Sequence, residues 1–102
     1  MYKILIVEDD RTISVIIEEK LNKWGYVTHR VKDFKDILIE FTSFKPHLVL
    51  MDINLPYYDG FYWCAKIRQL SNIPIISLLY LSHPGILMEI KSEQYHKVEM
   101  TI

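Results

Sequence analysis

The chain has 102 residues, half of them hydrophobic and a quarter charged, which fits one folded domain and excludes an intrinsically disordered segment. Its net charge of -1 and sequence pI near 6.4 give no broad electrostatic reason to expect nucleic-acid binding. The single cysteine, Cys64, excludes an internal disulfide and agrees with a cytoplasmic location, and no apolar stretch approaches the roughly 20 residues needed for membrane insertion.

The first third of the chain alternates between strand and helix patterns. Residues 2–7 are an apolar run typical of a strand buried on both faces. Residues 12–24 have apolar positions at helical spacing, with Asp10 as the expected N-cap and Gly25 at the expected C-terminal end. Residues 26–31 then alternate like a more exposed strand.

The pattern continues through residue 76. Asp33 is expected to cap a second helix, and residues 47–51 form another buried strand. A third helix over residues 61–70 and a strand over residues 73–76 follow. The second helix would place Phe34, Ile37, Leu38 and Phe41 on one face. Strands that alternate with helices predict an α/β fold, with a parallel sheet covered by helices on both faces.

Acidic side chains follow two of these strands. Glu8, Asp9 and Asp10 come after the first strand, and Asp52 comes after the third. Because the carboxyl ends of parallel strands share one edge of the sheet, these residues should meet there, where the strand order reverses. The plainer interpretation is that each acid is a solvated loop residue or helix cap, and Asp10 fits that description best.

Carboxylates gathered in one crevice repel one another unless a cation neutralises them. Mg²⁺ prefers about six oxygen ligands, commonly one or two carboxylates with waters and a phosphate. We expect Asp9 and Asp52 to bind it directly, Glu8 to act through water, and the backbone carbonyl of Asn54 to complete the protein's share. Asp52 would then be placed to become an aspartyl phosphate.

The segments ILIVEDD, LVLMDINLPYYDG and IRQLSNIPII, in this order, resemble the receiver domains of bacterial two-component response regulators of the OmpR/PhoB type. The resemblance covers residues 2–76. It implies that Asp52 is the phosphoacceptor, that Glu8 and Asp9 hold Mg²⁺, and that Asn54 supplies the carbonyl ligand. Pro56 and Gly60 match loop residues that shape the site.

The resemblance also implies a flavodoxin-like three-layer fold and a sensor histidine kinase as partner. Such a domain accepts a phosphoryl group and is not a turnover enzyme. More narrowly, residues 57–75 are similar to regulators that respond to antimicrobial peptides alongside transporter-linked kinases. The winged-helix output domain of this type is not found in the sequence, so no DNA binding is expected from this chain alone.

Residues 77–102 depart from the receiver pattern, so the fold is expected to be a core over residues 1–76 with an aberrant tail. The lysine that should end a fifth strand is missing, and the hydroxyl residue that should end the fourth strand is matched by position at Ser77 or Ser82. Read one base out of frame, synonymous codons for residues 81–102 permit receiver-like segments, one of them ending Gly-Gly-Asp-Asp-Tyr. We therefore hypothesise that a small insertion near codons 77–80 shifted the frame.

The tail still has local preferences. Residues 77–81 can extend the fourth strand, residues 86–97 have helix propensity, and residues 98–102 can form a terminal strand. His83 and His96 lack partners at metal-ligand spacing and are expected on the surface. Without the usual last helices, one face of the sheet would be incompletely covered, which favours self-association such as a homodimer.

Two other functions fit parts of the pattern. A haloacid-dehalogenase-like phosphatase also has an aspartate after a buried strand, but that class needs a second aspartate where this chain has Asn54. A receiver-like interaction module could instead bind a kinase without being phosphorylated, because the first helix is intact and the switch residues are missing.

Overall fold

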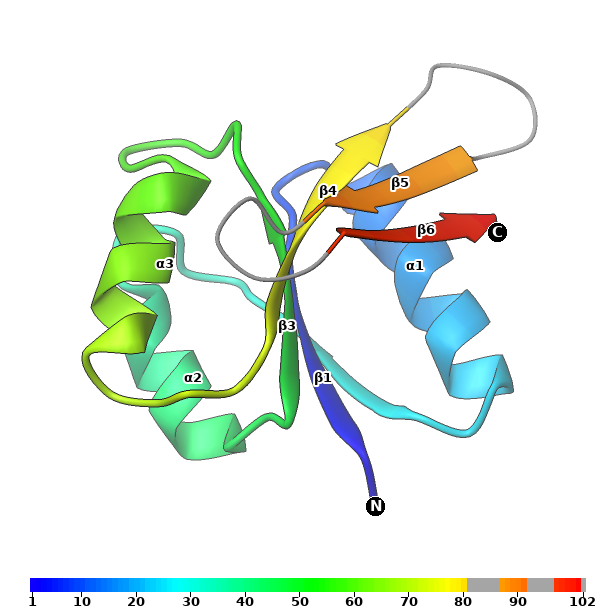
Figure 1. Ribbon diagram of the computed structural model, residues 1–102, viewed down its shortest axis with the longest axis horizontal. Coiled ribbons are helices and arrows are strands. Elements are labelled where there is room, and N and C mark those ends of the chain that lie inside the picture. Colours follow the sequence, from blue (N-terminus) through cyan, green and yellow to red (C-terminus); the bar gives the residue numbers. More distant parts are fainter. Residues whose placement is uncertain (81–86, 92–96, 102) are drawn as a thin grey trace.

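A six-stranded sheet with helices on both faces forms the fold in the computed structural model (Figure 1). The structure describes the backbone of residues 1–80, 87–91 and 97–101, and the side chains of residues 1–78. The strand order is β2-β1-β3-β4-β5-β6. The first four strands in chain order are β1 (Lys3–Val7), β2 (Val27–Arg30), β3 (Leu48–Asp52) and β4 (Ile75–Tyr80).

These four strands are parallel, as the alternating pattern predicts. β1 pairs with β2 on one side and with β3 on the other, and β3 pairs with β4. The chain therefore moves from β1 outward to β2 and then returns past β1 to β3. That reversal places the topological switch point between the carboxyl ends of β1 and β3.

Helices cover the two faces of the sheet unequally. Helix α1 (Arg11–Lys23) lies on one face, and α2 (Ile37–Phe44) and α3 (Gly60–Arg68) lie on the other (Figure 1). Strands β1, β3 and β4 divide their side chains between two hydrophobic clusters, since successive strand residues point to opposite faces. The α1 cluster consists of Ile4, Ile6, Ile17, Leu21, Leu50 and Leu78.

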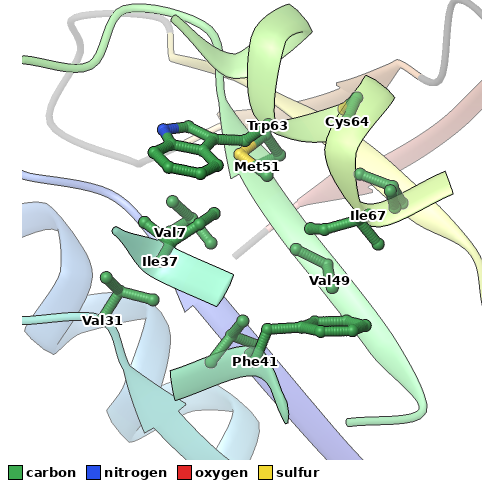
Figure 2. Packing of buried hydrophobic residues seen from close by; sticks show 11 residues of the cluster. Val7, Val31, Ile37, Phe41, Val49, Met51, Trp63, Cys64 and Ile67 are labelled. Atoms are coloured by element: carbon green, nitrogen blue, oxygen red, sulfur yellow. The ribbon is translucent and has the colours of Figure 1, made fainter. Parts of the chain in front are cut away.

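The second cluster fills the space between the sheet and the helices α2 and α3 (Figure 2). Met51 and Val49 from β3 meet Trp63 and Ile67 from α3 there, and all four are buried. The predicted third helix is thus present, but Leu70 lies beyond its end and is exposed. No helix in the described part of the chain has the length and apolar character needed to cross a membrane.

The ends of α1 are as predicted. The Asp10 carboxylate accepts a hydrogen bond from the Ile13 N–H at 3.1 Å and so caps the first turn. Gly25 has φ of +94°, in the left-handed region that suits glycine after a helix. The first βα unit of the fold is therefore determined by local residues.

The predicted cap of the second helix is wrong. Asp36, not Asp33, caps α2, and its carboxylate accepts from the Leu38 N–H at 3.1 Å. Asp33 instead accepts from the Lys35 N–H at 3.0 Å, which forms a turn before the helix. Phe34 consequently packs against the core from the loop and not from the helix.

The tail differs from its predicted secondary structure. Strand β4 extends through Tyr80 as expected, but β5 (Leu87–Lys91) is a strand where helix was predicted for residues 86–97. It pairs antiparallel with β4, and β6 (Lys97–Thr101) pairs antiparallel with β5, which confirms the terminal strand. Pairing with the open edge of β4 outweighs a weak helix propensity. Ser82, His83 and His96 lie outside the described residues.

Candidate functional site

Three carboxylates converge at the carboxyl edge of the sheet, as the sequence predicts. Each of Glu8, Asp9 and Asp52 has a carboxylate oxygen within 4.8 Å of one from each of the other two. Glu8 and Asp52 are only 4% and 8% exposed, whereas Asp9 is exposed. The site is therefore a half-buried acidic cluster with one open side.

Short-range hydrogen bonds orient the two buried acids. The Glu8 carboxylate accepts from the Asp10 N–H at 2.8 Å, so the turn after β1 holds its side chain. The Asp52 carboxylate accepts from the Asn54 N–H at 3.2 Å. Asn54 therefore contacts the cluster through its backbone N–H, and a role for its carbonyl stays a prediction.

The loop after β3 folds back on the strand at Gly60. The Gly60 N–H donates to the Ile53 carbonyl at 2.8 Å. A Cβ added at Gly60 would lie 2.3 Å from the Asp52 carbonyl oxygen, which is closer than any side chain permits. Asp59 caps α3 immediately before this glycine, by accepting from the Tyr62 N–H at 2.8 Å. Only glycine lets α3 begin this close to the residue that carries the carboxylate.

Burial raises the pKa of Asp52 above its ordinary value. The negative charge of Asp9 raises it further, while the Asn54 N–H and a hydrogen bond with Glu8 act in the opposite direction. Burial and the neighbouring Asp9 thus destabilise the ionised form of Asp52. This is the electrostatic condition under which a cation or a positively charged partner binds with a gain in free energy.

The residues present fit a hard divalent cation. Mg²⁺ bonds to oxygen at about 2.1 Å, so opposite ligands lie about 4.2 Å apart and neighbouring ones closer. The oxygens of Glu8, Asp9 and Asp52 have nearly this spread without any rearrangement. Carboxylate oxygens are also the ligand type that Mg²⁺ prefers, and the open side at Asp9 leaves room for waters.

Of the two hydroxyl residues predicted as possible switches, Ser77 and Ser82, only Ser77 lies in the part of the chain that the structure describes. Ser77 lies in β4 opposite Met51, one position before Leu78, which is the partner of Asp52. It is therefore beside the site in the sheet register and is partly exposed. Whether it contacts a phosphoryl group stays a prediction, and Ser82 is among the residues that the structure does not describe.

A hollow adjoins the acidic cluster on the β2 side, and it was not predicted from the sequence. It has a volume of about 280 Å³, and Glu8 and Asp9 form part of its wall. Three cationic side chains, Arg11, Arg30 and Lys32, complete much of the lining. A sequence signal existed, because Arg11 begins the helix after the acidic triplet and the other two surround the carboxyl end of β2.

Comparison with known proteins agrees with this geometry. The family model for the response regulator receiver domain matches residues 4–92, past the end of the motif resemblance at residue 76. The sensory transduction protein BceR of Halalkalibacterium halodurans is 50% identical over 84 residues, which are 82% of this chain and 36% of that protein. This chain therefore spans about a third of the length of that relative.

Two solved structures have the same fold. The N-terminal domain of the nisin resistance regulator NsrR, a lantibiotic response regulator, superposes with a TM-score of 0.73 at 42% identity, covering 82% of this chain and 71% of that one. The complex of histidine kinase ThkA with response regulator protein TrrA matches with a TM-score of 0.71 at 30% identity, covering 82% of this chain and 73% of the matched chain.

Proposed function

Because this chain belongs to the response regulator receiver domain family, we propose that Asp52 accepts a phosphoryl group from a sensor histidine kinase. The observation that carries the proposal is the convergence of the Glu8, Asp9 and Asp52 carboxylates within 4.8 Å at the switch point of the sheet. A lone acid after a strand would be an ordinary loop residue. Three acids from two distant turns form a site.

The proposed reaction is a phosphoryl transfer to a carboxylate. An Asp52 carboxylate oxygen forms a new bond to phosphorus, and the bond from phosphorus to the donor's leaving atom breaks with its electron pair. For a phosphohistidine donor, the leaving imidazole takes up a proton. The Asn54 N–H, 3.2 Å from the Asp52 carboxylate, orients the nucleophile.

We assign the metal ligands to Asp9 and Asp52, with Glu8 acting through water and the Asn54 carbonyl completing the set. Bound there, Mg²⁺ would supply positive charge that offsets the repulsion between the carboxylates and the incoming phosphoryl group. Glu8 is buried and held by the Asp10 N–H, so its side chain is placed before the ion binds. Such preorganisation lowers the cost of binding.

The wider assignment follows from the relatives. ThkA is a histidine kinase in complex with a response regulator, which supports a kinase as the partner here. The likeness to BceR supports an OmpR/PhoB-type receiver, and the likeness to NsrR, a lantibiotic response regulator, supports the branch that responds to antimicrobial peptides. We place the protein in the cytoplasm, acting as an acceptor rather than as a turnover enzyme, without DNA binding by residues 1–102 alone.

The test uses the full chain with Mg²⁺ and acetyl phosphate, a small acyl-phosphate donor. We expect a mass gain of one phosphoryl group on Asp52, dependent on Mg²⁺. The variant Asp52→Asn should lose the gain. The control Asp36→Asn should keep it, because asparagine also caps helices well and Asp36 lies at α2, outside the cluster. A phosphoryl group found elsewhere, or none at all, would contradict the proposal.

A second candidate is a receiver-like module that binds a kinase without being phosphorylated. It is favoured by the antiparallel strands β5 and β6, which follow β4 where the resemblance implies further helix-strand units. Kinase binding without mass gain on Asp52 would select this module. The frameshift hypothesis for residues 77–102 is tested separately, by reading the coding DNA for a receiver sequence in the shifted register.

A further inference from the structure

The hollow beside the acidic cluster has walls of both charges. Its volume is about 280 Å³, and it shares Glu8 and Asp9 with the cluster. It is also lined by Arg11 at the start of α1, and by Arg30 and Lys32 at the end of β2. A ligand in this hollow would therefore contact the acids that surround Asp52 and also face three cations.

The three cations are not equivalent. Arg30 is neutralised locally, because its Nε lies 3.2 Å from a Glu18 carboxylate oxygen and its guanidinium donates to the Ser14 hydroxyl at 3.3 Å. Among the described side chains, neither Arg11 nor Lys32 takes part in an ion pair. Arg11 and Lys32 therefore supply the uncompensated positive charge of the hollow.

The backbone around both cations is held in place. Lys32 donates its backbone N–H to both carboxylate oxygens of Glu40 at 3.1 Å, which ties the loop after β2 to helix α2. Arg11 begins α1 directly after the cap Asp10. A cation in the first turn is unfavourable for the helix dipole, so Arg11 does not stabilise α1 by its charge. The positive charge of Arg11 at this position is therefore explained by an interaction outside the helix.

We propose that this hollow receives the phosphoryl donor, and that Arg11 and Lys32 attract its dianionic phosphoryl group toward Asp52. The proposal rests on the proposed function and deepens it. An acidic cluster repels a dianion, and a single divalent ion does not neutralise three carboxylates. Arg11 and Lys32 offset the negative charge of Glu8 and Asp9 in the wall of the hollow, and so raise the local donor concentration.

The shared chemistry is the phosphoryl dianion, which acetyl phosphate and phosphoimidazole both present on different leaving groups. The experiment measures the rate of Asp52 phosphorylation of the full chain against the concentration of each donor, with Mg²⁺ present. In the variant that combines Arg11→Gln and Lys32→Gln, we expect the half-saturating concentration of both donors to rise about tenfold, at the low end of electrostatic steering. The maximal rate should stay unchanged, and the difference should shrink at high salt.

Mg²⁺ binding, followed through tryptophan fluorescence without any donor, provides the second readout. Removal of two cations beside the acids should tighten Mg²⁺ binding while it weakens donor binding. Damage to the fold would weaken both, so the opposite signs identify the charge effect. Lys20→Gln, near the far end of α1 and outside the hollow, is the matched control and should change neither quantity.

Several results would overturn the inference. An unchanged half-saturating concentration in the double variant would show that the cations do not meet the donor. An effect on one donor alone would assign them to the leaving group instead of the phosphoryl group. If the unmodified chain takes up no phosphoryl group from either donor, the proposed function itself fails, and that outcome is recognisable before any variant is made.

Discussion

Adjacent acids have three different tasks at the scale of single residues. Glu8 is buried and held by a backbone N–H, Asp9 is exposed on the open side of the cluster, and Asp10 caps α1. Their spacing along the turn after β1 assigns these tasks, because each successive side chain points in a different direction. Insertion or deletion of one residue in this turn would therefore remove both the acidic cluster and the cap of α1.

Gly60 is the residue on which the geometry of Asp52 depends most directly. In Gly60→Ala, the new Cβ would lie 2.3 Å from the Asp52 carbonyl oxygen, so the backbone of either β3 or α3 must move. We expect a loss of about 2 kcal/mol or more in the free energy of unfolding, measured by urea denaturation, since overpacking against backbone cannot be relieved by a rotamer change. Phosphorylation of Asp52 should fall as well.

Gly25→Ala is the matched control for this change. Gly25 has a left-handed φ of +94°, but a Cβ there would meet no atom within 4 Å. We expect it to cost about 1 kcal/mol through backbone strain alone, with Mg²⁺ affinity unchanged. If Gly60→Ala cost no more than Gly25→Ala and kept Mg²⁺ affinity, the close approach at Asp52 would be refuted.

At the scale of elements, one carboxylate joins β2, the following loop and α2. Glu40 of α2 accepts from the His29 ring at 2.7 Å, and from the backbone N–H groups of Lys32 and Asp33 at 3.1 and 2.9 Å. Burial alone would raise the pKa of Glu40, but the hydrogen bonds from Asp33, His29 and Lys32 lower it below 4.5. This side chain therefore fixes the loop that carries Lys32.

The lowered pKa of Glu40 makes this link dependent on pH. The folded state favours the ionised carboxylate of Glu40. Its contribution to the stability of the fold is therefore complete above pH 4.5, the ordinary pKa of the group, and is lost as the pH falls through the lower pKa of the folded state. Glu40→Gln resembles the protonated form. We expect it to cost about 1–2 kcal/mol near neutral pH, the usual value for hydrogen bonds to a charged group.

Urea denaturation of Glu40→Gln at several pH values checks this. The difference from the unmodified chain should narrow toward zero below the pKa of Glu40, where both side chains are neutral. The exposed Glu19 of α1 serves as control, and Glu19→Gln should change stability little at any pH. If Glu40→Gln lowered the free energy of unfolding by the same amount at every pH, the charge of Glu40 would contribute nothing to stability.

At the scale of the whole molecule, the two faces of the sheet are covered to different extents. The α1 face retains an open apolar hollow of about 330 Å³, bordered by Tyr2, Tyr26, Leu48 and Ile76. On the other face, side chains from α2 and α3 pack against the sheet (Figure 2), and a hollow of about 400 Å³ lies beside Phe41, Pro46 and Leu70. The expected incomplete cover of one face and homodimer formation through it stay predictions, because the side chains of residues 79–102 lie outside the described part of the chain.

Mg²⁺ should stabilise the entire fold, because its proposed ligands come from the turn after β1 and from the end of β3, and they lie together only in the folded state. At a concentration one hundred times the dissociation constant, one site adds about 2.7 kcal/mol, which a thermal melt records as a higher Tm. Asp9→Asn should remove this increment. It should not destabilise the metal-free protein, since the negative charge of Asp9 opposes ionisation of Asp52.

Asp36→Asn again serves as the control and should retain the rise in Tm. If Asp9→Asn kept the full increment, Mg²⁺ would be bound elsewhere. If the unmodified chain showed no increment, the acidic cluster would not be a metal site under those conditions.

The sequence by itself determined the parallel core and the meeting of Glu8, Asp9 and Asp52. Both follow from local periodicity and from the rule that parallel strands end at one edge. The cap at Asp10 was also predictable, because a cap depends on residues three positions away. The cap depends only on neighbours in sequence, whereas the meeting of the carboxylates follows from the alternation of strands and helices along the chain.

Only the structure identified Asp36 as the cap of α2 in place of the predicted Asp33, in a loop whose Lys32 and Asp33 N–H groups donate to Glu40 of α2. It also turned residues 87–91 into a strand, since the open edge of β4 offers hydrogen bonds that outweigh helix propensity. The tertiary structure also brings Arg11 from the start of α1 and Lys32 from the loop after β2 into the lining of one hollow. Distant segments supply partners that a local pattern does not contain.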